Sequence, residues 1–113
     1  MAYLREEKDT FEIAYPLEEV WVKVPKAVRR LKGWKILEKD DQAHTAKIKT
    51  KGAFLSYGST LYIEAKAVDE KTTRMSLNAE TPVTTITSVA DFGRTRDRVD
   101  QFIAELAHLM NKD

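Results

Sequence analysis

The stretch that decides the fold lies near the C-terminus and reads DFGRTRDRVDQFIAELAHLM over residues 91–110. Placed at 3.6 residues per turn, its apolar side chains fall within about 120° of arc, a pattern typical of an amphipathic helix. These side chains are Phe92, Val99, Phe102, Ile103, Leu106, Leu109 and Met110. Asp91 stands at the position of an N-cap. The sequence therefore predicts a long C-terminal helix that buries one face.

The N-terminal third of the chain predicts one strand followed by one helix. Residues 11–15 place aromatic and aliphatic side chains at every second position, as a half-buried strand does. Pro16 suits the first turn of a helix. The apolar residues that follow share about 100° of arc, and they are Leu17, Val20, Trp21, Val24, Val28 and Leu31. We expect this helix to bend at Pro25 and to stop at Gly33.

Four further strands are predicted between the two helices. They cover residues 34–40, 44–51, 59–67 and 72–79. The connections between them are too short for crossover helices, so the sheet should be antiparallel. The predicted fold class is α+β, with the order strand, helix, four strands, helix.

Composition excludes several classes of protein. The chain has 113 residues, enough for one domain, and 19 Lys plus Arg against 18 Asp plus Glu, which argues against a general polyanion binder. It has no cysteine, so disulfides, thiolate catalysis and Cys-ligated metals are excluded. The sequence shows neither a signal-peptide pattern nor an apolar run long enough to span a membrane. We expect a cytoplasmic protein without a nucleic-acid partner.

The predicted order resembles the helix-grip (TBP-like) fold of the birch-pollen-allergen and START lipid-binding superfamily. Pro16, Val20-Trp21, Gly33-Trp34 and Ile36 look like the first helix and second strand of small bacterial and archaeal members. The resemblance implies a sheet gripped by the C-terminal helix, with an apolar ligand between them. On this basis residues 1–9 are expected to be a flexible N-terminus and residues 10–113 a single helix-grip-like domain.

A shorter motif is similar to the Asp-x-Gly-x-Asn-Arg-x-Arg-Val signature of a bacterial family of unknown function. The matching residues are Asp91, Gly93, Arg96, Arg98 and Val99. Thr95 stands where the signature has asparagine. This resemblance implies the fold and no particular activity.

Two segments, residues 52–63 and 81–90, carry no charge in a chain that is one-third charged. One interpretation makes them the lips of a pocket that offers apolar contact and a few polar groups. The candidate ligand-binding residues are Phe54, Tyr57, Tyr62, Thr84, Ile86, Phe92 and Phe102. The alternative interpretation is a loose hairpin connection and an edge strand packed on the last helix.

Arg94, Arg96 and Arg98 cluster in the first turn of the C-terminal helix, where the helix dipole disfavours cations. They are candidates for binding a carboxylate or phosphate together with backbone N–H groups. The structural alternative is that carboxylates pair with them and hold the helix on the sheet. On a helical wheel Arg96 and Arg98 flank the apolar stripe, which favours this structural role for those two.

Other charged and titratable residues suggest no site. Lys47, Lys49 and Lys51 share one strand face, and we interpret them as lysines that protect an edge strand from pairing. His44 and His108 have no partners at metal-ligand spacing, so no metal is expected. No catalytic or nucleotide-binding motif appears.

We therefore expect a small non-enzymatic domain without a cofactor. Its expected partner is a small apolar or amphipathic molecule held between the sheet and the C-terminal helix. The alternative is a protein–protein interaction or self-assembly module without a pocket, in which the chain forms a homo-oligomer.

Overall fold

The computed structural model describes residues 3–52, 58–83 and 94–111. Its elements are β1 (Tyr3–Ile13), α1 (Leu17–Arg30), β2 (Lys35–Asp40), β3 (Thr45–Lys49), β4 (Thr60–Asp69), β5 (Thr72–Val83) and α3 (Arg94–Asn111). Their order along the chain is the predicted one, with two helices and five strands in the described ranges.

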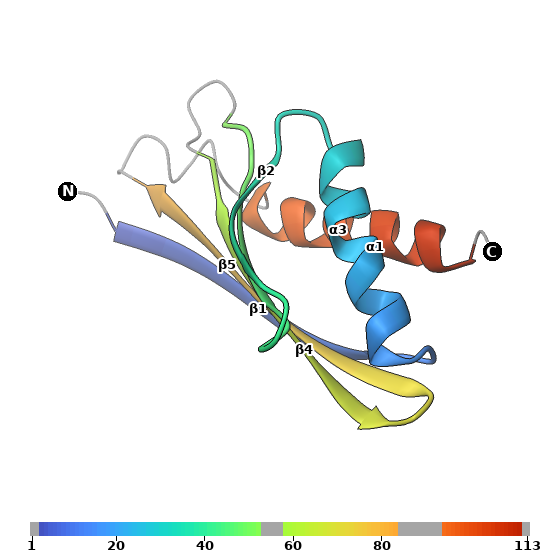
Figure 1. Cartoon of the computed structure of the whole chain (residues 1–113). Coiled ribbons are helices and arrows are strands. Elements are labelled where there is room, and N and C mark those ends of the chain that lie inside the picture. The colour runs from blue at the N-terminus through green and yellow to red at the C-terminus, as the bar shows by residue number, and fades with distance from the viewer. Residues whose placement is uncertain (1–2, 53–57, 84–93, 112–113) are drawn as a thin grey trace.

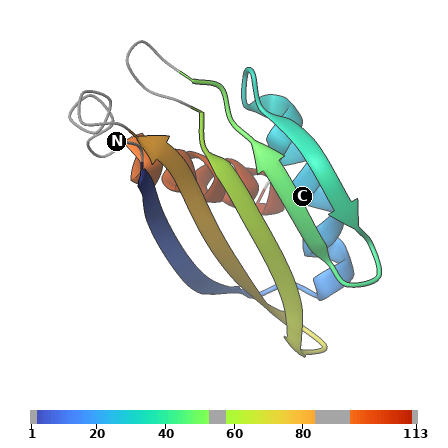
Figure 2. The same cartoon turned by 90° about the vertical axis from the view of Figure 1, so that its left-hand side faces the viewer.

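The five strands form one antiparallel sheet in the order β1-β5-β4-β3-β2, so β4 is the central strand. Both helices lie on the same side of this sheet, which curves around them (Figure 1). Viewed from the other side, the sheet stands in front of the helices (Figure 2). We call the helix side the inner face and the opposite side the outer face. The predicted α+β class and helix-grip arrangement are confirmed.

The core fills the space between the inner face and the two helices. Along β4, Leu61, Ile63 and Ala65 are buried and alternate with exposed residues, as a sheet with one covered face requires. From the helices, Val24 and Phe102 are fully buried against this face. The other buried apolar residues are Val20, Trp21, Ala27, Val28, Ala46, Ile48, Met75, Leu77, Ala79, Val99, Leu106, Leu109 and Met110.

Residues 3–9, which the sequence places ahead of the domain, belong to β1. In the register with β5, Asp9 lies opposite the buried Leu77, so its carboxylate points to the inner face. An acidic side chain on the inner face breaks the alternation of apolar and polar residues that marks a strand in sequence. The sequence pattern therefore does not predict the first part of β1, and only its pairing with β5 in the structure identifies it as a strand.

Two smaller expectations are also corrected. Because β3 lies between β4 and β2, its Lys47 and Lys49 do not protect an edge and instead project from the outer face. The first helix ends at Arg30, before Gly33. Gly33 has a φ of +84°, and a Cβ there would lie 2.7 Å from the Cβ of Lys51. Glycine is therefore needed where the chain turns from α1 into β2.

Candidate ligand-binding site

A chain of buried hydroxyl groups joins the first turn of α3 to the sheet. Ser59 lies just before β4, Thr81 lies near the end of β5, and Thr95 is the second residue of α3. The Ser59 Oγ and Thr81 Oγ1 atoms are 2.5 Å apart, and Thr81 Oγ1 lies 2.7 Å from Thr95 Oγ1. All three residues have no exposed surface. At the start of α3, hydrogen bonds between hydroxyls thus replace apolar packing between the helix and the sheet.

Arg98 extends this hydroxyl chain with a buried cation. It is only 6 % exposed, and its Nη1 donates a hydrogen bond of 2.7 Å to Ser59 Oγ. The position of Ser59 is held by Thr50, whose Oγ1 accepts from the Ser59 backbone N–H at 2.8 Å and whose own N–H donates to the Ser59 carbonyl at 2.9 Å. Burying a guanidinium costs several kcal/mol unless hydrogen bonds offset the lost hydration. We call Thr50, Ser59, Thr81, Thr95 and Arg98 the buried polar cluster.

The cluster connects the two uncharged segments that the sequence singled out. Ser59 belongs to the first segment and Thr81 begins the second. Their hydroxyls are in direct hydrogen-bond contact although 22 residues separate them in sequence. Ser59 and Thr81, one from each segment, therefore meet at one place in the fold, between β4, β5 and α3.

A hollow of about 330 Å³ adjoins the buried polar cluster and shares Arg98 with it. Its other lining residues are Lys32, Trp34, Lys51, Gly52, Asp97 and Gln101. The lining thus contains three cationic side chains, one carboxylate and an indole ring. A hollow of this composition favours an anionic group over a cationic one.

The second arginine, Arg96, has a different environment. Its Nη2 lies 2.9 Å from Asp9 Oδ2 of β1 and 3.0 Å from Asp100 Oδ1 of its own helix. The hydrogen bond to Asp9 raises the pKa of the Arg96 guanidinium above its ordinary value. Arg96 thus ties α3 to the edge of the sheet. Arg94 begins α3, and its side chain lies outside the described residues.

The candidate aromatic and apolar ligand contacts do not form one group. Phe102 is fully buried beneath α3, whereas Tyr62 is 40 % exposed on the outer face. Tyr62 occupies the opposite side of β4 from Leu61 and Ile63, because side chains alternate along a strand. Tyr62 and Phe102 therefore cannot line the same pocket. The remaining candidates, Phe54, Tyr57, Thr84, Ile86 and Phe92, lie outside the described residues.

Sequence reasoning did not nominate the hydroxyl residues of the buried polar cluster. The available signal was their parity: Ser59 continues the inward series of Leu61 and Ile63, and Thr81 continues that of Leu77 and Ala79. A hydroxyl residue at an inward position of a strand must find a hydrogen-bond partner. Two such positions at the same end of neighbouring strands indicate a buried polar contact.

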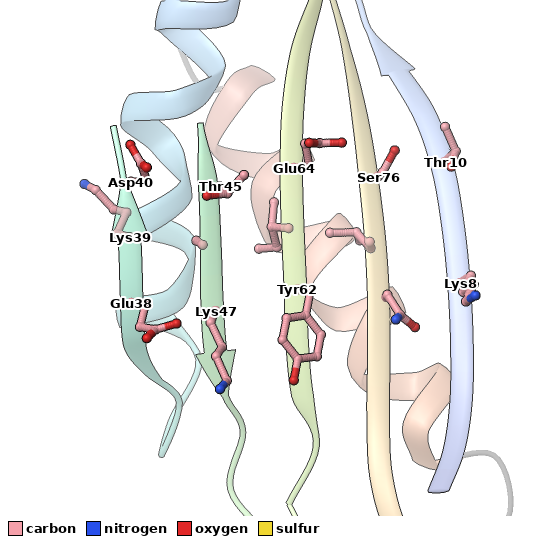
Figure 3. A pocket seen from close by; sticks show the side chains of 14 residues that line it. Lys8, Thr10, Glu38, Lys39, Asp40, Thr45, Lys47, Tyr62, Glu64 and Ser76 are labelled. Atoms are coloured by element: carbon pink, nitrogen blue, oxygen red, sulfur yellow. The ribbon is translucent and has the colours of Figure 1, made fainter. Parts of the chain in front are cut away.

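A second, larger hollow lies on the outer face and has a volume of about 870 Å³. It extends across all five strands, from Lys8 and Thr10 of β1 to Glu38 of β2 (Figure 3). Tyr62 stands near its middle, and the Lys47 Nζ lies 5.8 Å from the centre of the Tyr62 ring. This hollow is separated from the buried polar cluster by the thickness of the sheet.

The histidines are not part of either hollow. His44 packs edge-on against Trp21 with ring centres 5.4 Å apart, and its Nε2 lies 3.1 Å from Glu18 Oε1. The Trp21 indole also donates a hydrogen bond of 2.9 Å to Asp41, which lowers the pKa of that carboxyl below its ordinary value. His108 is exposed on α3. Across residues 3–52, 58–83 and 94–111, no three His, Asp or Glu side chains gather as metal ligands would.

Comparison with known proteins finds similarity of structure only. No family model matches the sequence, and no curated protein matches it as a relative. Norcoclaurine synthase from Thalictrum flavum superposes with a TM-score of 0.74 at 10 % identity, over 99 % of this chain and 89 % of that one. The same enzyme is known in complex with dopamine and hydroxybenzaldehyde, and that structure gives a TM-score of 0.73 at 11 % identity over 98 % of this chain and 88 % of that one.

Two further structures are also similar. The Zhui aromatase/cyclase from Streptomyces sp. R1128 has a TM-score of 0.65 at 13 % identity, over 94 % of this chain and 93 % of that one. Ara h 8.0201 has a TM-score of 0.60 at 9 % identity, over 97 % of this chain and 100 % of that one. Together these structures identify the fold as helix-grip. Neither α1 nor α3 is apolar over a length that could cross a bilayer, and the described residues contain no other helix.

Proposed function

We propose that this chain is a ligand-binding domain that holds a small amphipathic molecule in the hollow that α3 forms with Trp34 and Lys51, with an anionic group of that molecule beside Arg98. The observation that carries the proposal is the buried polar cluster at the start of α3. It combines a cation that is only 6 % exposed with hydroxyls that have no exposed surface, next to a hollow lined by Lys32 and Lys51.

The chemistry of the cluster favours recognition over stabilisation. Apolar side chains at these positions would be as stabilising as buried ionic groups or more so, because burying a charge costs hydration energy. A hydroxyl can both donate and accept, so Ser59 accepts from Arg98 while it contacts Thr81, and the hydroxyls hold the guanidinium in place beside the hollow. A guanidinium binds carboxylates and phosphates through charge-assisted hydrogen bonds.

The structural neighbours support a ligand-binding role in general. The norcoclaurine synthase complex holds dopamine and hydroxybenzaldehyde, and the Zhui protein is named as an aromatase/cyclase. At 10–13 % identity this similarity concerns the fold, so the ligand class for this chain is argued from its own residues. Trp34 at the smaller hollow offers a ring face to the apolar part of a ligand.

The test compares two ligands that differ only in charge. A fluorescent fatty acid and the corresponding fatty alcohol are titrated into the protein at low ionic strength. We expect saturable binding of the acid at micromolar concentration and binding of the alcohol that is weaker by at least about tenfold, since a charge-assisted hydrogen bond contributes about 1.5–3 kcal/mol. Equal binding of the two probes, or no saturable binding of either, would contradict the proposal.

Arg98→Met tests the same site through the protein. We expect it to abolish the preference for the acid while leaving binding of the alcohol unchanged, because methionine keeps much of the apolar bulk of the side chain. Arg74→Met is the matched control: Arg74 is exposed on the outer face, where it pairs with Glu12. Circular dichroism of each variant shows whether it is folded. An acid preference that survives in folded Arg98→Met would exclude Arg98 as the anion contact.

A further inference from the structure

The outer face of the sheet carries an ordered pattern of charges. The strand registers align five side chains across it, one from each strand: Lys8, Asn78, Tyr62, Lys47 and Glu38. This row has a cation on the edge strand β1 and an anion on the opposite edge strand β2. The central strand β4 contributes Tyr62, which is 40 % exposed.

The adjacent row has the same kind of asymmetry with the signs reversed. It runs through Glu6, Glu80, Thr60, Lys49 and Lys35. The β1 and β5 side of this row is therefore acidic, and the β3 and β2 side is basic. On the other side of the first row, Thr10, Ser76, Glu64, Thr45 and Asp40 form a third row that is polar or acidic.

We propose that this outer face binds a second copy of the same chain, with the two sheets face to face about a two-fold axis that runs along β4. Such an axis places β1 opposite the partner's β2 and β5 opposite the partner's β3, because β4 is the central strand. Lys8 then faces the partner's Glu38, Glu6 faces the partner's Lys35, and Glu80 faces the partner's Lys49. Symmetry repeats each pair, so six pairs of opposite charges meet. Glu64 of β4 meets the partner's Glu64 on the axis, where its carboxylate is paired with Lys66 of its own strand.

Within one copy the two edges cannot neutralise each other. Lys8 and Glu38 are separated by four strand spacings, about 19 Å. Among the ion pairs of the described residues, none involves Lys8, Glu38, Glu6 or Lys35. These four residues are exposed. Their charges are therefore available to a partner, and the partner that complements them at both edges is the same surface turned over.

The shape of the face sets the strength of this association. The outer hollow extends from β1 to β2, with Lys8 on one side, Glu38 on the other and Tyr62 between them (Figure 3). In the proposed dimer the two Tyr62 side chains face each other across the middle. Aligned sheets pack about 10 Å apart, and water fills polar gaps between them. The three rows cover roughly 19 by 14 Å of backbone, which is smaller than a standard interface. We expect a weak dimer that depends on salt.

The first measurement is the oligomeric state of the unmodified protein. Sedimentation velocity from 10 to 500 µM should show a monomer–dimer equilibrium in low salt that weakens at least fivefold in 500 mM NaCl, because exposed ion pairs are screened. A protein that is monomeric at 500 µM in low salt would overturn the proposal. A dimer that salt does not weaken would overturn it as well.

Charge exchange identifies the surface. Lys8→Glu and Glu38→Lys each place like charges opposite one another, so each variant should dimerise at least tenfold more weakly. The double variant Lys8→Glu/Glu38→Lys should recover dimerisation to within about threefold, because opposite charges again face each other. An equimolar mixture of the two single variants should form a heterodimer, since in that pairing both contacts join opposite charges.

The controls are Lys26→Glu and Glu19→Lys, which make the same changes at exposed positions of α1 on the other side of the sheet. These should leave the monomer–dimer equilibrium within twofold of the unmodified protein. Failure of the double variant to recover dimerisation would exclude the proposed two-fold axis. Titration of the fatty acid into monomeric Lys8→Glu separates this interface from the ligand site, which lies on the inner face.

Discussion

Replacing Arg98 by alanine should destabilise the fold far more than the same change at Arg96. Arg98 is 6 % exposed and donates to Ser59 Oγ, so its removal leaves a buried hydroxyl chain without its cationic donor and a space beneath α3. The loss of a hydrogen bond from a charged group amounts to about 1.5–3 kcal/mol. The Arg96 side chain is 39 % exposed and that of its partner Asp9 is 28 % exposed. A pair so accessible to water contributes only about 0.2–1 kcal/mol.

These free energies translate into measurable shifts of the melting temperature. Unfolding entropy is about 2.1 cal/mol/K per residue, so in this chain of 113 residues 1 kcal/mol corresponds to about 4 °C. We expect Arg98→Ala to melt about 6–13 °C lower and Arg96→Ala about 1–4 °C lower. Differential scanning calorimetry at low ionic strength measures both. The argument from burial is refuted if Arg98→Ala melts within 2 °C of the unmodified protein, or if Arg96→Ala melts lower than Arg98→Ala.

Two further predictions concern the turn after α1 and the contact between Trp21 and Asp41. Gly33→Ala should lower the free energy of unfolding by at least about 1 kcal/mol, because alanine disfavours a φ of +84° and its Cβ would meet Lys51. Urea denaturation at equilibrium measures this change. An unchanged free energy of unfolding would contradict it. The Trp21 hydrogen bond lowers the pKa of Asp41 in the folded state, so its stabilisation is complete above about pH 4 and is lost as the pH falls through the folded-state pKa. Asp41→Asn should therefore lose less stability than the unmodified protein between pH 5 and 2, as measured by urea denaturation followed by tryptophan fluorescence. If the free energy of unfolding falls equally with pH in both proteins, this contact is not responsible.

Local patterns in the sequence determined most of the secondary structure. The apolar stripe that contains Phe102 and Leu106 predicts α3, and the alternation of Leu61, Ile63 and Ala65 predicts β4. These predictions succeeded because each segment buries one face against the same core, and this gives its apolar residues a regular spacing along the sequence. They failed where an inward position is charged. Asp9 conceals the start of β1, because its partner Arg96 lies 87 residues away.

The candidate site could be anticipated only in outline. One interpretation of the uncharged residues 52–63 and 81–90 made them the lips of a pocket, and the structure brings Ser59 of one segment into contact with Thr81 of the other. The sequence did not show which side chains share a pocket. The candidate ligand contacts include both Tyr62 and Phe102, and the sheet separates them because strand parity sends Tyr62 to the outer face.

The amino-acid sequence by itself determined the kind and order of the elements in residues 3–52, 58–83 and 94–111, because helix and strand periodicities are properties of neighbouring residues. The tertiary structure alone decided that β4 is the central strand, that β3 is not an edge, and that Arg98 is buried whereas Arg96 pairs with β1. Strand order and charge pairing depend on contacts between residues far apart in the chain. Such contacts form only when the sheet packs on its helices, so no local sequence pattern predicts them.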